Sequence, residues 1–450
     1  MEVYTLLAYH RHIFASQERG ELPPVIEAKK HIVPVDSSVS STSTAKISCD
    51  TGSESFAKAD RTLAQQNKVA DIKSADLRDN LTAIGLLVAD ALKDSGWGQV
   101  DRDSIKVEDA SGAGGSMTYK ISAAGATPTA VGLHSRDSSL CPKSEERTRA
   151  AAQIFGENGL SPRRIAEGID WFIDPWEGFG QPIWATVADM KVLGKELAKV
   201  HKLPIDWYTP FKAQLKEEFP FYAKVPDSSH IWWYSCRTLV LVTNHAAKEP
   251  EWLREYVQPM FTPQTKAAAR IVTCHGDLHA GNMISLAKGC PMQPGSVRFV
   301  DLEFSHVTAA CYDLSYVAFH FEDMPLKDKG IPRDDVGAMR RAFLASYLEA
   351  MEQPSTDEDV DALLIDITLA ACGHHFGLFK PWSCELTALT KFKQLAEQLL
   401  SSQDEQKRFR ERGPEGWFAD KGYDKCSSCQ DKDLLPHFKF LDRIVSSSRA

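Results

Sequence analysis

The sequence of 450 residues lacks several features that would assign it at once to a structural class. No apolar run approaches the ~18 residues that span a bilayer, so no membrane-spanning helix is expected. Basic residues are too few for a nucleic-acid-binding surface, because 52 Lys and Arg against 61 Asp and Glu leave a net charge of −9. Only Cys426 and Cys429 form a Cys-x-x-Cys pair, and no second pair supplies the other ligands of a zinc site.

The N-terminal segment also lacks the features of a secretory signal, since Glu2 stands near its front and its apolar run is broken. The ten cysteines are scattered along the chain. These absences together predict a cytoplasmic protein with free thiols. Hydrophobic residues at 43% and charged residues at 25% are ordinary values for a globular protein.

The chain divides into four segments of different character. Residues 1–72 are predicted to be a disordered tail, because the Ser- and Thr-rich stretch in them cannot bury enough apolar surface to offset its ordering entropy. Residues 73–175 are predicted to form a small lobe with a sheet, and residues 176–403 a larger helical lobe. Residues 404–450 form a C-terminal extension of undetermined order.

The small lobe is predicted from short apolar segments separated by glycine-rich turns. An amphipathic helix is expected between Ser74 and Gly96, where leucine, isoleucine and valine recur at spacings of three and four. Strands joined by turns of this kind form an antiparallel sheet. The expected strands are 105–108, 117–122, 129–135 and 169–173, and the expected second helix is 144–157.

The larger segment reads mostly as helix, interrupted by two strands that each lead into a charged loop. The strands are expected at 269–274 and 297–300, and the later helices at 340–351, 360–376 and 386–401. The predicted fold class is therefore α+β and bilobal, with an antiparallel sheet in the N-terminal lobe and a mainly helical C-terminal lobe.

The strongest chemical signal lies in the two loops that follow these strands, CHGDLHAGNMI (274–284) and VRFVDLEFS (297–305). Asp277, Asn282 and Asp301 supply carboxylate and amide oxygens, which are the hard ligands that Mg²⁺ prefers. Phosphoryl transfer requires one carboxylate to orient a substrate hydroxyl and further oxygens to hold Mg²⁺ against the phosphates of ATP. An incidental polar turn would not explain both loops and the glycine-rich segment upstream.

This pattern resembles the superfamily of aminoglycoside phosphotransferases and choline kinases, which have a protein-kinase-like fold. The resemblance covers roughly residues 100–400 and rests on HxDxxxxN followed by a strand ending in Asp-x-Glu. It implies ATP and Mg²⁺ as cofactors, Asp277 as the catalytic base and His275 as the residue that supports its loop. It further implies that Asn282 and Asp301 bind the metal. Asp313, twelve residues after Asp301, is interpreted as a structural carboxylate at a helix start.

The nucleotide-binding residues are expected in the small lobe. The glycine-rich loop would cover the phosphates with its backbone N–H groups, although a plain hairpin turn would look the same; its residues are Ser111, Gly112, Gly114, Gly115 and Ser116. The family carries a Lys or Arg on the third strand, where this chain offers His134 and Arg136. Glu145 or Glu146 is the expected ion-pair partner of this basic residue. The alternative is that the third strand is an exposed edge whose charged side chains are merely solvated. The backbone near Phe172 and Ile173 is expected to bind adenine.

The acceptor is predicted to be an amino-alcohol, choline or ethanolamine. KELAKVHKLP (195–204) and GHHFGLFKPW (373–382) are similar to segments of the choline and ethanolamine kinases. The resemblance implies Glu303, of the Asp-x-Glu motif, and Phe376 and Phe379 as the substrate residues. The faces of the two aromatic rings would attract a quaternary ammonium group. Choline kinases commonly have Asn where this chain has Gly276. The alternatives are a kinase of another small hydroxyl compound (aminoglycoside-like, sugar-derived or amino-acid-like) and a catalytically weak, nucleotide-binding pseudokinase.

Overall fold

The computed structural model describes seven stretches of the chain, and the predicted tail and the Cys426–Cys429 segment lie outside them. The described residues are 80–111, 117–135, 145–218, 263–287, 292–320, 334–379 and 386–423. They form two compact units, one of residues up to 137 with Ile165–Asp174, the other of Ser138–Arg164 and residues from Pro175 onward. Within the described ranges, no helix combines the length and the apolar character needed to cross a membrane.

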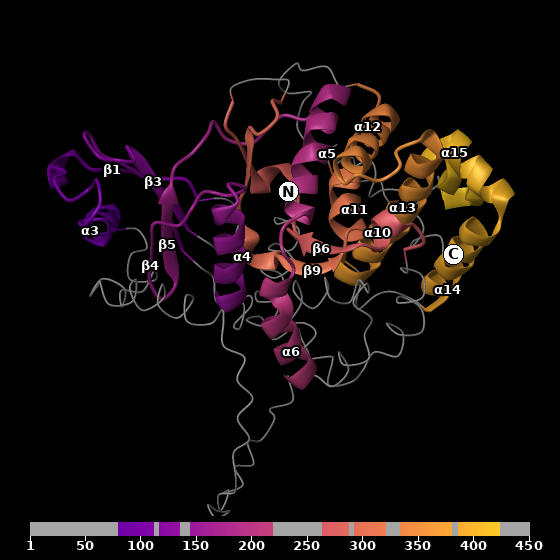
Figure 1. Ribbon diagram of the computed structural model, residues 1–450, viewed down its shortest axis with the longest axis horizontal. Helices are drawn as coiled ribbons and strands as arrows, with labels where there is room; N and C mark the ends of the chain where they lie inside the picture. Colours follow the sequence, from indigo (N-terminus) through magenta and orange to yellow (C-terminus); the bar gives the residue numbers. More distant parts are fainter. Residues whose placement is uncertain are drawn as a thin grey trace, which may run out of the picture. The chain divides into compact units, whose positions relative to one another are not determined.

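The first unit is a five-stranded sheet with a helix packed on one face. The strand order is β1-β2-β3-β5-β4, and the pairs β1–β2, β2–β3 and β4–β5 are antiparallel. Figure 1 labels β1, β3, β4 and β5 of this sheet. The elements are α3 (Leu81–Ala91), β1 (Lys106–Asp109), β2 (Thr118–Ser122), β3 (Ala130–Ser135), β4 (Ala166–Glu167) and β5 (Trp171–Pro175).

The apolar face of this sheet is set by alternation along the strands, since successive side chains point to opposite faces. Tyr119, Ile121 and Leu133 are buried in one core with Ile84 and Val88 of α3. Asn80 begins α3 as its N-cap by accepting a hydrogen bond from the backbone N–H of Ala83 at 3.0 Å. Along β2, the residues that point to the opposite face are polar: Thr118, Lys120 and Ser122.

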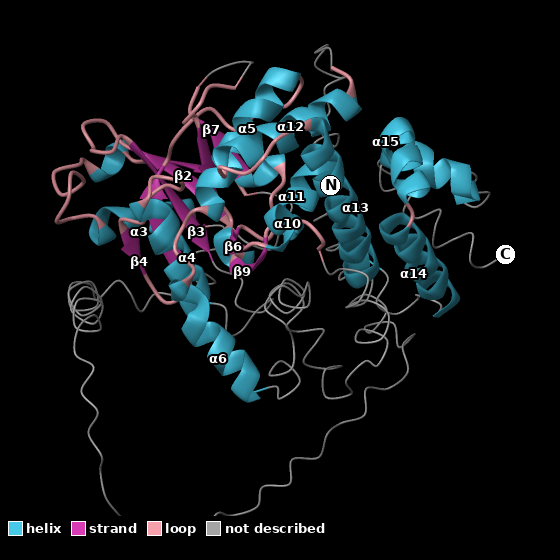
Figure 2. Ribbon diagram, turned by 45° about the vertical axis from the view of Figure 1, so that its right-hand side comes forward, coloured by secondary structure: helices cyan, strands magenta, loops and turns pink. Residues whose placement is uncertain are grey.

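The second unit is mainly helical (Figure 2), with two short antiparallel strand pairs. Helix α5 packs on α12, and α11 packs on α13. The helices are α4 (Glu145–Glu157), α5 (Val187–His201), α6 (Thr209–Glu218), α10 (Lys266–Ala269), α11 (Cys311–His320), α12 (Val336–Ala350), α13 (Asp357–Phe379), α14 (Leu386–Ser401) and α15 (Gln403–Phe418). The strands are β6 (Ile271–Cys274), β7 (Met283–Ser285), β8 (Val297–Phe299) and β9 (His306–Ala309).

The α+β class predicted from the sequence is confirmed, with strands in the N-terminal region and helices in the C-terminal region. Helix α3 ends at Ala91 rather than at Gly96. Strand β9 was not predicted, although its run HVTA contains β-branched residues. Part of the C-terminal extension forms α15, which bends where Gly413 has a φ of 68° and Pro414 follows. The four predicted segment boundaries remain predictions.

Candidate functional site

The two strand pairs of the second unit bring the predicted loops together. Strand β6 pairs with β9 and ends directly before His275, while β7 starts directly after Asn282 and pairs with β8. Beyond the last pair of β7 and β8, the backbone N–H of Val300 donates to the carbonyl of Asn282 at 3.0 Å. Asn282 and Asp301, which are far apart in the sequence, therefore lie at the same end of this strand pair.

The ring of His275 connects the two loops. Its Nε2 lies 2.9 Å from the carbonyl oxygen of Val300, and its Nδ1 accepts a hydrogen bond from the backbone N–H of Asp277 at 3.3 Å. A carbonyl oxygen only accepts and a backbone N–H only donates, so this geometry assigns the ring proton to Nε2. His275 is 0% exposed and holds the backbone before Asp301 against the backbone of Asp277.

Asp277 is buried and surrounded by donors from its own loop. The side-chain amide of Asn282 donates to the backbone carbonyl of Asp277 at 2.9 Å and to its Oδ2 at 3.2 Å. His279 Nε2 lies 3.8 Å from the same Oδ2, and His279 Nδ1 accepts from the backbone N–H of Gly281 at 3.0 Å. Because the amide nitrogen of Asn282 is turned to Asp277, its amide oxygen is the atom that can serve a cation.

Asp301 follows β8 in a left-handed backbone conformation, with φ 60° and ψ 57°. Aspartate tolerates this conformation better than most residues with a Cβ, and the side chain is exposed. The following turn is held from α4, since a guanidinium nitrogen of the buried Arg147 donates to the carbonyl of Glu303 at 2.6 Å. The carboxylate of Asp301 and the amide oxygen of Asn282 fit the oxygen ligands of a hard divalent cation.

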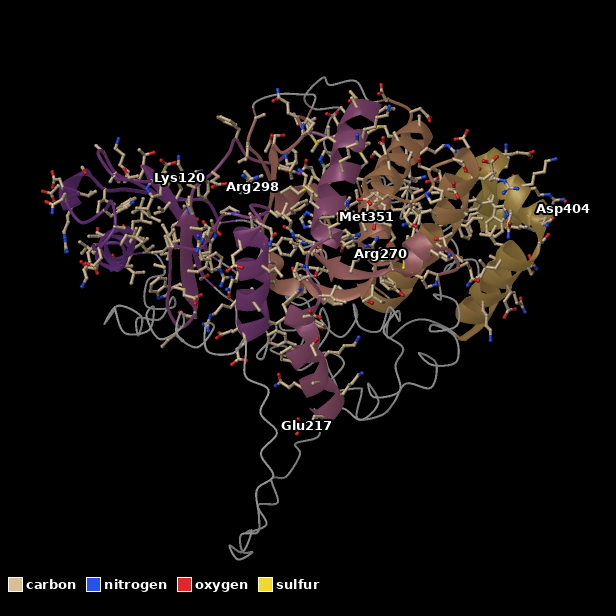
Figure 3. All side chains as sticks on the ribbon, viewed as in Figure 1. Lys120, Glu217, Arg270, Arg298, Met351 and Asp404 are labelled. Carbon is tan, nitrogen blue, oxygen red and sulfur yellow. The ribbon has the colours of Figure 1, made fainter. Side chains whose placement is uncertain are left out.

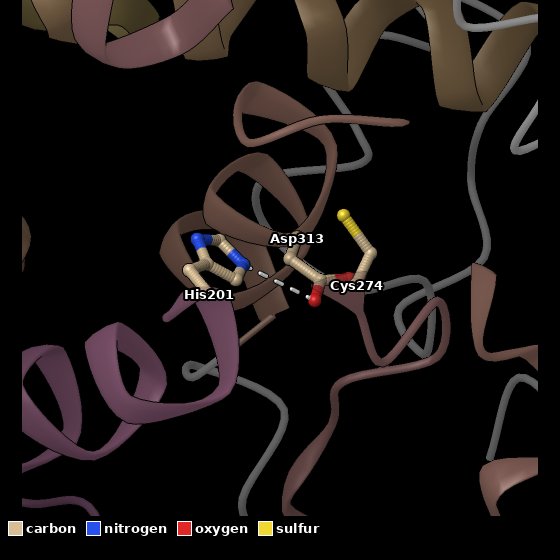
Figure 4. Close-up of side chains that lie close together, drawn as sticks. All are labelled: His201, Cys274 and Asp313. Atoms are coloured by element: carbon tan, nitrogen blue, oxygen red, sulfur yellow. Dashed lines mark hydrogen bonds and ion pairs between the residues drawn. The ribbon is translucent and has the colours of Figure 1, made fainter. Parts of the chain in front are cut away.

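The carboxylate of Asp313, at the start of α11, anchors the backbone of the loop that follows β6. Its two oxygens accept the backbone N–H groups of His275 at 2.6 Å and of Gly276 at 2.9 Å. His201, at the end of α5, lies 3.4 Å from the same carboxylate (Figure 4). Burial alone raises the pKa of Asp313, but the hydrogen bond and charge of His201 outweigh it, and the pKa is lowered from 3.8.

His201 and Tyr347 complete this anchor, and the sequence did not assign either to the site. The hydroxyl of Tyr347 on α12 lies 2.8 Å from Nδ1 of His201, and both side chains are buried. The sequence signal for His201 is its place in KELAKVHKLP, which is similar to a segment of the choline and ethanolamine kinases. Tyr347 carried no signal, because a tyrosine on an amphipathic helix is an ordinary core residue.

Nitrogen, sulfur and oxygen atoms of His201, Cys274 and Asp313 lie within 4.8 Å of one another, which is close enough for a metal site. Hydrogen bonds already use both oxygens of Asp313 and both ring nitrogens of His201. Burial and the charge of Asp313 raise the pKa of the Cys274 thiol well above 9.0, so the thiol stays protonated. The cluster therefore fits a hydrogen-bonded anchor better than a metal centre.

Gly276 is required by its backbone, because its φ is 87° and a Cβ there would run into the carbonyl oxygen of Phe304. The same Cβ would lie 3.1 Å from Nδ1 of His306. His306 is buried, and its Nδ1 donates to the carbonyl of Phe304 at 2.8 Å. Burial lowers the pKa of His306 from 6.5 to about 4.

His306 is expected to make folding sensitive to moderate acid. The unfolded chain binds a proton at His306 below pH 6.5, whereas the folded chain does so only near pH 4, so stability is lost as the pH falls through this window. The loss is roughly 3 kcal/mol, and His306→Asn should remove it. Urea unfolding of both proteins between pH 7 and pH 4 measures the difference; parallel stability curves would contradict it.

In the first unit, His134 lies on β3 with both ring nitrogens in contact with its own sheet. Nε2 is 3.0 Å from the Asp174 carboxylate, Nδ1 is 3.3 Å from the Thr118 hydroxyl, and the ring stacks on Phe172 at 4.7 Å between centroids. The carboxylate partner within this unit is thus Asp174, while Glu146 is exposed on α4 of the other unit. Ile173 is buried, and its carbonyl accepts from the N–H of Ile165.

Several predicted site residues are outside what the structure describes. Ser111 is described, and its hydroxyl and N–H bond to Thr118 and Asp109. The other members of the predicted phosphate loop, and the second candidate for the phosphate clamp, are outside the described residues: Gly112, Gly114, Gly115, Ser116 and Arg136. Phe376 and Phe379 lie on α13, but their side chains are not among those described.

Residues 187–395 match the protein-family model described as choline/ethanolamine kinase. This segment contains His201, the HGDLHAGN loop and Asp313. The match confirms the predicted superfamily. It supports a small-molecule kinase, and the family implies the use of ATP and a divalent metal. No curated protein matches the chain by sequence.

Solved structures of small-molecule kinases are similar to this chain at low identity. An ethanolamine kinase from Plasmodium vivax has 15% identity and a TM-score of 0.46, over 90% of this chain and 97% of that chain. A choline kinase from Cryptosporidium parvum has 12% identity and a TM-score of 0.45, over 75% and 98%. A macrolide 2′-phosphotransferase from Brachybacterium faecium has 13% identity and a TM-score of 0.36, over 66% of this chain and 93% of that chain.

Proposed function

We propose that this protein is an ATP- and Mg²⁺-dependent kinase that transfers the γ-phosphoryl group of ATP to the hydroxyl of an amino-alcohol, choline or ethanolamine. The observation that carries the proposal is the convergence of Asp277, Asn282 and Asp301 at the ends of two strand pairs, with His275 bonded to both loops. Such a set needs no covalent chemistry of its own, because positioning and charge neutralisation supply most of the catalysis of phosphoryl transfer.

In this mechanism Asp277 orients the acceptor hydroxyl and takes its proton. The O–H bond of the acceptor breaks, a bond forms between its oxygen and the γ-phosphorus, and the bond to the bridging oxygen breaks as ADP leaves. Asn282 and Asp301 would hold the metal, which neutralises charge on the phosphates when bound. The Asn282 amide donates to Asp277 Oδ2 at 3.2 Å and thereby fixes the direction of that carboxylate.

The choice of acceptor rests on the family to which residues 187–395 are matched, whose description names choline and ethanolamine. Gly276 favours a second candidate, a kinase of another small hydroxyl compound. A Cβ at this position would run into the carbonyl oxygen of Phe304, which excludes the Asn that is common there in choline kinases. Both candidates share the same roles for Asp277 and the metal ligands.

ADP release with Mg²⁺-ATP should be measured across a panel of amino-alcohols, sugars and aminoglycosides. Choline or ethanolamine is expected to give the highest kcat/KM, and chelation of the divalent metal should abolish turnover. Preferred turnover of a sugar or an aminoglycoside would favour the second candidate. Nucleotide binding without turnover of any compound would contradict the kinase and favour a pseudokinase.

A further inference from the structure

The face of the first unit's sheet that points away from α3 carries a polar row across β2 and β3. Thr118 pairs with His134, and Lys120 pairs with Gly132. Directly paired residues on antiparallel strands point to the same side. Because Tyr119 and Leu133, one position along, are buried against α3, this row faces away from the core.

His134 occupies the space above Gly132 on this face. A Cβ on Gly132 would lie 2.5 Å from Nε2 of His134 and 3.0 Å from the carboxylate oxygen of Asp174. The ring is further held by its stack on Phe172 and by the Thr118 hydroxyl. Both ring nitrogens of His134 are therefore engaged inside the sheet rather than presented to a phosphate.

Lys120 is a cation on the same face, opposite the glycine and only two residues into β2 (Figure 3 labels it). Its ammonium group lies 3.4 Å from the carboxylate of Glu108 on β1, with 32% of the Lys120 side chain and 59% of the Glu108 side chain exposed. An ion pair between side chains this exposed is weak, so Lys120 can exchange the carboxylate of Glu108 for another anion. Lys106 lies on the same face, but it opens β1 opposite Ser122, at the far end from the glycine-rich loop.

We propose that Lys120 provides the positive charge that holds the α- and β-phosphates of ATP. The inference rests on the proposed kinase function and refines it, since the family likeness assigns this charge to the third strand. The clamp is built within the β1–β2 hairpin, with Glu108 as the partner that orients Lys120 before the nucleotide binds. Lys120 on β2 thereby replaces the positive charge that the family carries on the third strand, which is β3 in this chain.

The test is the affinity of a fluorescent ATP analogue in the presence of Mg²⁺, measured with the full chain. Lys120→Met should weaken binding by about 10-fold or more, and Lys120→Arg, which keeps the charge, should retain most of it. Lys106→Met is the matched control on the same face and should bind as the wild type does. Thermal unfolding of each variant verifies that it is folded.

Wild-type affinity in a folded Lys120→Met would overturn the inference while leaving the proposed function intact. A loss of affinity in Arg136→Met alongside it would assign the charge to Arg136 instead. An absence of nucleotide binding by the wild-type protein itself would instead overturn the proposed function, and the inference with it. The KM for the acceptor should stay within about threefold in Lys120→Met, because the variant alters the nucleotide contact alone.

Discussion

Asp277→Asn is expected to lower kcat for phosphoryl transfer by about 10³-fold, within the range of ~10²–10⁴ that a positioned general base contributes. Asparagine keeps the size of the side chain but cannot take the proton of the acceptor hydroxyl. The backbone N–H of residue 277 would still donate to His275, so the loop should keep its conformation. Binding of ATP and thermal stability should therefore change little, while ADP release falls to near background.

The control for this variant is Asp94→Asn, the same chemical change at an exposed carboxylate in a turn of the first unit. Its kcat should equal that of the wild type. A kcat for Asp277→Asn within a few-fold of the wild type, measured on the best acceptor from the panel, would show that Asp277 is not the base. A loss of ATP binding in the variant would show that its effect is not confined to proton transfer.

Asp313→Ala should be the most destabilising single substitution near the site. The buried carboxylate accepts the backbone N–H groups of His275 and Gly276, and His201 lies against it. A buried donor that loses its acceptor costs ~1–3 kcal/mol, so the free energy of unfolding should fall by about 3 kcal/mol or more. Asp313→Asn, which keeps an acceptor oxygen, should lose less.

Urea unfolding at neutral pH measures this loss, and Asp206→Ala, at an exposed carboxylate of the second unit, is the control. The pH dependence supplies a second check. Since the folded-state pKa of Asp313 is below 3.8, its stabilisation is complete above pH 3.8 and is lost as the pH falls through the lowered pKa. The difference between the wild type and Asp313→Asn should shrink only in that acidic range. Equal stability of the wild type and Asp313→Ala at pH 7 would rule out the anchor.

The proposed phosphoryl-transfer chemistry depends on residues in two loops. His275, Asp277 and Asn282 lie within eight residues, so their grouping could be predicted from the sequence. The position of Asp301 beside them could be predicted only as a family likeness, because it depends on the pairing of β7 with β8.

By itself, the sequence determined the α+β class, the approximate strands and helices, and the grouping of His275, Asp277 and Asn282 in one loop. These features depend on periodicity and short-range spacing, which are local properties of the chain. Tertiary structure alone decided that His201 and Tyr347 support Asp313, and that His134 pairs with Asp174 while Lys120 faces Gly132. These contacts join residues on different helices or strands, and their partners follow from packing and strand register rather than from spacing in the sequence.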